Sequence, residues 1–61
     1  MTMSEFQRGE AIELLERLTI MRAEEIEEYE DYELEAWIDE LGYEWREGTG
    51  YGLGAWVEVQ T

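Results

Sequence analysis

The chain of 61 residues contains no cysteine, histidine, proline or lysine. Without cysteine and histidine, it has no disulfide, no thiolate chemistry and none of the usual zinc ligands. Without proline, helices can run uninterrupted. Without lysine, four arginines are the only basic side chains, and they face 17 acidic ones for a net charge of −13. Long apolar runs are also missing, so the sequence offers no candidate for a membrane span of about 20 residues.

This charge excludes two classes of partner. A strongly acidic surface is repelled by free nucleic acid and by anionic membranes, so we expect neither direct DNA or RNA binding nor membrane binding. The first residues lack the charged and apolar segments of a secretory signal, and we expect a cytoplasmic protein. Acidic chains are often disordered, but 44% hydrophobic residues, with three Trp, four Tyr and one Phe, favour a folded single domain over residues 1–61.

The hydrophobic spacing predicts helices in the first two thirds of the chain. Ser4 and Gln7 form a capping-box pattern that opens a first helix. Its predicted core stripe has helical spacing and consists of Ala11, Leu14, Leu15 and Leu18, flanked by Ile12. Within this helix we expect two ion pairs, Glu5 with Arg8 and Glu13 with Arg17.

A break over residues 19–22 should follow, with Ile20 and Met21 packing inward. A short helix over 23–30 would then turn Ile26 and Tyr29 toward the interior or its rim. Asp31 is the expected N-cap of a third helix that ends at Gly42. The apolar residues of this third helix are Leu34, Trp37, Ile38 and Leu41. A single helix over 23–41 is the competing prediction.

After Gly42 the period changes from helical to alternating, which predicts an antiparallel hairpin over 43–60 around a glycine-rich link. The residues expected on its apolar face are Tyr43, Trp45, Leu53, Ala55, Val57 and Val59. Trp56 alternates with the valines, so it should lie on the opposite face, either exposed as a contact or covered by the first helix. The expected fold class is α+β, with two or three N-terminal helices packed on a C-terminal hairpin.

No pattern indicates an enzyme, a cofactor or a metal site. Every acid lies on the polar side of its helix or strand, whereas a catalytic carboxyl pair needs an apolar pocket and a cleft. Residues 24–35 lack the glycine of an EF-hand loop, so only diffuse divalent-cation binding is expected. The glycines at 48, 50, 52 and 54 precede a strand rather than a helix, which favours a hairpin loop over a phosphate loop. Tyr51 in that loop is a further candidate contact.

The acidic residues are concentrated in one part of the chain. Residues 1–22 carry three arginines against four acids, whereas residues 23–47 carry one arginine against twelve acids. Like charges one helical turn apart repel, so this segregation does not stabilise the fold. Acids repeated along a helix approach the charge density of duplex phosphates, which predicts binding to an Arg/Lys-lined surface built for DNA or RNA.

In its size, its acidity, its lack of cysteine and its aromatic α+β core, the chain resembles the nucleic-acid mimics of phages and mobile elements, among them several anti-CRISPR proteins. The resemblance covers the whole chain but includes no diagnostic motif. It implies an inhibitor in the host cytoplasm that occupies the nucleic-acid groove of a defence nuclease or its surveillance complex. Anti-CRISPR proteins also block a nuclease recruitment surface or enforce an inactive dimer, and both routes remain open.

The sequence therefore favours a non-enzymatic inhibitor that acts by charge mimicry and binds a basic nucleic-acid-binding protein or complex. The expected contact residues are Glu24, Glu27, Glu28, Glu30, Asp31, Tyr32, Glu33, Glu35, Asp39 and Glu40. The rival hypothesis is a small adaptor or a homodimeric module whose partner contacts the aromatic side chains of Tyr51 and Trp56.

Overall fold

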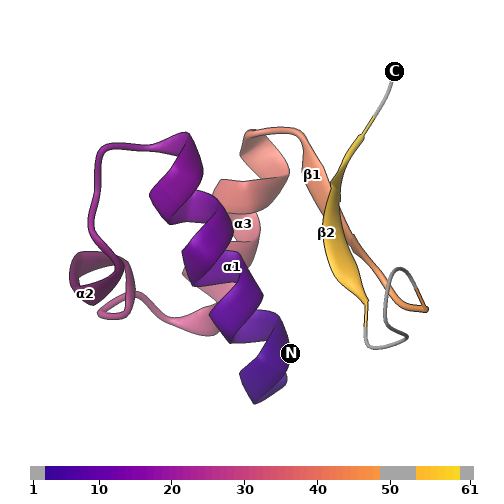
Figure 1. Cartoon of the computed structure of the whole chain (residues 1–61), viewed down its shortest axis with the longest axis horizontal. Helices are drawn as coiled ribbons and strands as arrows, with labels where there is room; N and C mark the ends of the chain where they lie inside the picture. The colour runs from indigo at the N-terminus through magenta and orange to yellow at the C-terminus, as the bar shows by residue number, and fades with distance from the viewer. Residues whose placement is uncertain (1–2, 49–53, 60–61) are drawn as a thin grey trace.

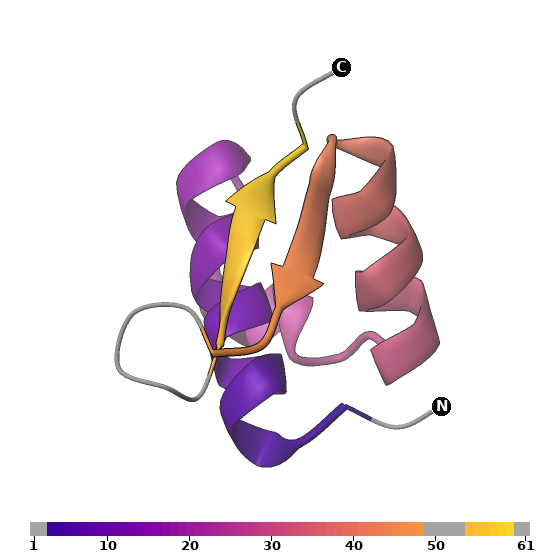
Figure 2. The same cartoon turned by 90° about the vertical axis from the view of Figure 1, so that its right-hand side faces the viewer.

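The structure, a computed structural model, describes residues 3–48 and 54–59. Three helices precede a two-stranded antiparallel hairpin, which confirms the α+β prediction. Figures 1 and 2 show the hairpin covering one side of the pair formed by α1 and α3, while the short α2 lies at the other side of the molecule. The bounds are α1 Glu5–Leu18, α2 Ala23–Ile26, α3 Asp31–Glu40, β1 Tyr43–Arg46 and β2 Ala55–Glu58.

Helix α1 supplies much of the core. Ser4 is its N-cap, and the Ser4 hydroxyl accepts a hydrogen bond from the Gln7 N–H at 3.0 Å, as the capping pattern predicts. Leu18, expected in the stripe, is exposed because the chain leaves the helix at Thr19. The buried hydrophobic residues of the described chain are Met3, Ala11, Leu14, Leu15, Ile26, Leu34 and Ile38.

Residues 19–22 form the expected break, but only one of the two predicted inward side chains packs. Met21 contacts the core, whereas Ile20 is fully exposed. The prediction for Ile20 was wrong because neighbouring side chains in an extended segment point to opposite sides, so Met21 can turn inward only if Ile20 turns outward.

The competing prediction of one helix over 23–41 is also wrong. The Arg8 guanidinium donates to the backbone oxygens of Glu27 at 2.8 Å and Tyr29 at 2.7 Å. A continuous helix would use those carbonyls for its own hydrogen bonds four residues later. Because Arg8 takes them, α2 stops at Ile26 and the chain turns before α3.

Helix α3 starts one residue earlier than predicted. Its N-cap is Glu30, whose backbone is extended, and Glu33 Oε1 accepts from the Glu30 N–H at 3.0 Å. Asp31 cannot cap, because its carboxylate accepts from Arg8 at 2.5 Å and from the Met3 N–H at 3.0 Å. Arg8 therefore pairs with Asp31 rather than with Glu5. The helix stops before Gly42, whose φ of 91° is the expected left-handed terminator.

Strand β1 turns its predicted face to the helices, but β2 turns the opposite face from the one that the alternation suggested. Trp45 lies opposite Trp56 in the antiparallel register, and Glu44 lies opposite Val57. Cross-strand partners share a face of the sheet, so Trp56 belongs to the face of Tyr43 and Trp45, and Val57 to the other. Tyr43 and Trp56 pack against the core, and Val59 is exposed. The larger indole of Trp56, rather than the valines, packs against the helices. Of the two alternatives predicted for Trp56, this is the one in which the first helix covers it.

Aromatic contacts fasten the hairpin to α1. Trp45 meets Trp56 edge to face at a centroid distance of 5.3 Å, and Phe6 meets Trp45 at 6.1 Å. The Trp56 Nε1–H donates to the Gln7 backbone oxygen at 3.3 Å. Gly54, buried with a φ of 110°, lies under the Trp45 ring, where a Cβ atom would come within 2.6 Å of that ring.

We predict that Gly54→Ala lowers the free energy of unfolding by about 1–3 kcal/mol, because alanine disfavours the positive φ and its methyl group would push the Trp45 ring away. Gly9→Ala is the matched control, since Gly9 lies in the middle of α1 with nothing within 4 Å of an added Cβ. It should stabilise by about 0.5–1 kcal/mol. Urea unfolding followed by circular dichroism measures both, and equal shifts would contradict the packing of Trp45 on Gly54.

We also predict that Asp31→Asn lowers the free energy of unfolding by about 1–3 kcal/mol, because the partly buried Arg8 loses its ionic acceptor. Asp39→Asn, an exposed change on the same helix, should stay within about 0.5 kcal/mol of the wild type. Thermal and urea unfolding measure the difference. Two variants as stable as each other would show that the Arg8 pair contributes little.

Candidate protein-binding surface

Most of the predicted contact residues lie on α2, α3 and the turn that joins them. Every one is exposed except Asp31. Asp31 is half-buried and its carboxylate is held by Arg8 and by the Met3 N–H, so it contributes to the fold rather than to an open surface. The exposed acids of residues 24–40 are Glu24, Glu25, Glu27, Glu28, Glu30, Glu33, Glu35, Asp39 and Glu40, hereafter the acidic strip.

The arginines leave the acidic strip uncompensated. Within residues 3–48 and 54–59, the ion pairs are Arg8 with Asp31 and Arg46 with Glu44. Neither pair involves a carboxylate of the strip. Arg17, expected to pair with Glu13, forms no ion pair in this part of the chain, and Arg22 forms none there either. Nine carboxylates therefore face solvent without an arginine partner among the described residues.

The acids of α3 divide between two sides of the helix, as its helical period predicts. Glu35 and Asp39 line a groove together with Tyr32, whereas Glu33 lines a separate hollow. The strip therefore does not present all its charge on a single side of the molecule. The acids of α3 lie on two flanks of that helix.

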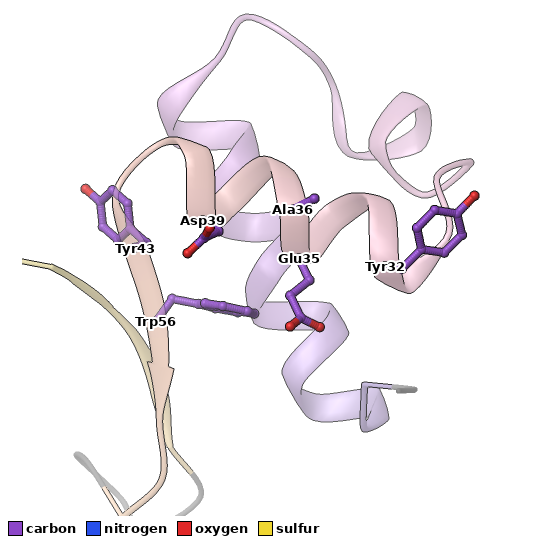
Figure 3. Close-up of a pocket in the computed structure, with 6 residues that line it drawn as sticks. All are labelled: Tyr32, Glu35, Ala36, Asp39, Tyr43 and Trp56. Carbon is purple, nitrogen blue, oxygen red and sulfur yellow. The ribbon is translucent and has the colours of Figure 1, made fainter.

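The groove between α3 and the hairpin combines strip acids with aromatic rings. Its volume is about 490 Å³, and its lining residues are Tyr32, Glu35, Ala36, Asp39, Tyr43 and Trp56. Figure 3 shows the Glu35 and Asp39 side chains on the side of α3 that faces the hairpin, with the Trp56 ring extending toward the helix. Tyr32 and Tyr43 lie toward the two ends of the lined stretch of helix.

Three of these lining residues were predicted together as contacts of the acidic segment, and Trp56 was named only as a contact in the rival hypothesis. Tyr32, Glu35 and Asp39 share a flank because of their spacing along α3. Tyr43 and Trp56 join them only through the hairpin register, which pairs Trp45 with Trp56. The sequence did contain a signal for this second wall of the groove, namely Gly42, which ends α3. A strand that starts immediately after that glycine runs back along α3.

A second hollow, of about 320 Å³, lies on another side of α3 and is lined by Met21, Tyr29, Glu33 and Trp37. Tyr29 meets Trp37 edge to face at a centroid distance of 5.6 Å, so Tyr29 packs at the rim of the core. Tyr32 differs, since 68% of its surface is accessible. Of the two tyrosines set among the acids, Tyr32 is the more exposed, since 37% of the Tyr29 surface is accessible.

The described residues offer few chemical groups other than carboxylates and aromatic rings. No three acids in this part of the chain come together in a way that could hold a metal ion. None of its helices is both long and apolar enough to cross a membrane. Most of the glycine-rich link, including Tyr51, lies outside the described residues.

Comparisons of the chain with protein-family models, with curated proteins and with solved structures found no match.

Proposed function

We propose that this protein is a non-enzymatic inhibitor that binds the basic nucleic-acid-binding surface of another protein or complex in place of DNA or RNA. One observation carries the proposal: nine exposed carboxylates between Glu24 and Glu40 have no arginine partner among the described residues. Such a strip gains nothing from its own fold, because its charges repel one another. A positively charged groove would relieve that repulsion.

The physical basis of the binding is the one that nucleic acids use. Acids one turn apart on a helix are separated by about 5.4 Å along its axis, while phosphates of one DNA strand recur about every 3.4 Å. The exposed acids of α2, of α3 and of the turn between them thus form a closely spaced series of negative charges. Their binding releases the anions held by the basic groove, and long-range attraction speeds the encounter.

We further propose a CRISPR-Cas-like defence complex as the class of target, on the strength of the chain's resemblance to small acidic phage inhibitors. The rival hypothesis is an adaptor whose partner contacts exposed aromatic side chains. One of its two anchors, Trp56, is partly buried, packs on the core and donates to the Gln7 backbone, so only part of its ring is open to a partner. The other anchor, Tyr51, lies outside the described residues.

We predict that the triple variant Glu24→Lys, Glu28→Lys, Glu35→Lys no longer captures a nucleic-acid-binding protein from a prokaryotic lysate that contains a CRISPR-Cas system. The wild type should capture one, and added duplex DNA or guide RNA should release it. The loss is expected because three side chains of the strip change from attracting to repelling a basic groove. Mass spectrometry of the captured fraction is the measurement.

The control for charge alone is Glu5→Lys, Glu13→Lys, Glu47→Lys, which changes three exposed acids outside the strip and gives the same net charge. It should retain capture. Circular dichroism should show both triple variants folded. Loss of capture in both variants would reduce the effect to net charge, and unchanged capture in the first would refute mimicry.

We also predict a steep salt dependence. Between about 50 and 200 mM NaCl, the affinity for the captured partner should fall at least about a hundredfold, because several ionic contacts are screened and their counterions return. Titration of the purified pair at four salt concentrations measures the slope. A nearly flat slope would favour an adaptor whose contacts are aromatic.

A further inference from the structure

The groove between α3 and the hairpin differs from the rest of the acidic strip because side chains bound it on two sides. Glu35 and Asp39, one helical turn apart, stand on one wall, and the rings of Tyr43 and Trp56 belong to the other. Its volume of about 490 Å³ lies within the range of about 300–1,000 Å³ that is typical of ligand sites. The groove can therefore surround part of a ligand, which an open row of carboxylates cannot.

The charges in the groove are available. Within the part of the chain that the structure describes, neither the Glu35 nor the Asp39 carboxylate forms an ion pair or accepts a hydrogen bond from another residue. Asp31 and Glu44 contrast with them, since arginines hold both of those carboxylates. Two unpartnered carboxylates beside aromatic rings suit a cation that is also flat.

We propose that this groove accepts an arginine side chain that projects from the basic surface of the partner. This inference rests on the proposed function, and it identifies the groove as the place where the partner is anchored. The guanidinium group is planar and carries five N–H donors, so it can donate to both carboxylates and stack on a ring. A lysine ammonium group is a compact, strongly hydrated charge that gains less from a ring face.

The groove and the rest of the strip would then have different roles. The acids of α2 and its following turn are exposed and lie outside the groove lining, so they attract the partner at a distance. The groove supplies a place where an arginine is partly removed from water, and arginine, tyrosine and tryptophan are the residues that most often dominate binding energy. Affinity should therefore be more sensitive to Glu35 and Asp39 than to other acids of the strip.

The test uses nona-arginine and nona-lysine peptides as probes and the whole protein in three forms. These forms are the wild type, the groove variant Glu35→Gln/Asp39→Asn, and the strip variant Glu24→Gln/Glu28→Gln, which removes the same charge outside the groove. Isothermal titration calorimetry gives the affinities. Two-dimensional NMR of the ¹⁵N-labelled protein follows the indole N–H of Trp56. Thermal unfolding checks that all three are folded.

We expect the wild type to bind nona-arginine at least about threefold more tightly than nona-lysine, with a shift of the Trp56 indole signal. The groove variant should lose about tenfold in nona-arginine affinity, and the strip variant about threefold or less. Equal losses in the two variants, or equal affinities for the two peptides, would overturn the arginine site and leave charge mimicry standing. No loss in either variant, together with insensitivity to salt, would overturn both proposals.

Discussion

The guanidinium of Arg8 is the contact on which the arrangement of the three helices depends. From the first turns of α1 it donates to the Asp31 carboxylate and to two backbone oxygens between α2 and α3. Those contacts end α2, place the start of α3 and hold the Met3 segment nearby through the same carboxylate. In a chain with four arginines, one of them joins the first turns of α1 to residues 27–31.

This use of Arg8 also separates a charge that holds the fold from charges that remain exposed. Asp31 lies in the middle of the acidic strip and yet is neutralised by the fold, whereas its neighbours Glu30 and Glu33 remain exposed. The strip gains its local order from backbone caps rather than from ion pairs, since Glu33 accepts from the Glu30 N–H. The fold can thus carry many acids on α3 without relying on them for stability.

The sequence predicted the fold class and the helical positions well, because those depend on local patterns. Leu34 and Ile38 are fully buried, and Gly42 ends the helix at a positive φ as expected. The errors came from contacts between distant residues. Three features depend on tertiary packing: the partner of Arg8, the break after Ile26 and the register of Trp45 with Trp56. The spacing of residues along the sequence does not report that packing.

The candidate site follows the same division. Tyr32, Glu35 and Asp39 could be grouped from helical spacing alone, but the opposite wall of the groove could not, because either face of β2 satisfies its alternation. The valines were expected to pack inward because they are the more regular apolar series. The indole of Trp56 displaced them by filling more of the space above α1.

Trp56 belongs both to the contacts that hold the hairpin on α1 and to the lining of the groove. Occupation of the groove and closure of the hairpin are therefore thermodynamically linked through one side chain. Any molecule that rests on that indole resists local opening of β2, so the backbone amides of the hairpin would exchange with solvent more slowly in the complex. A fold with so small a core would thus acquire part of its rigidity only when it is bound.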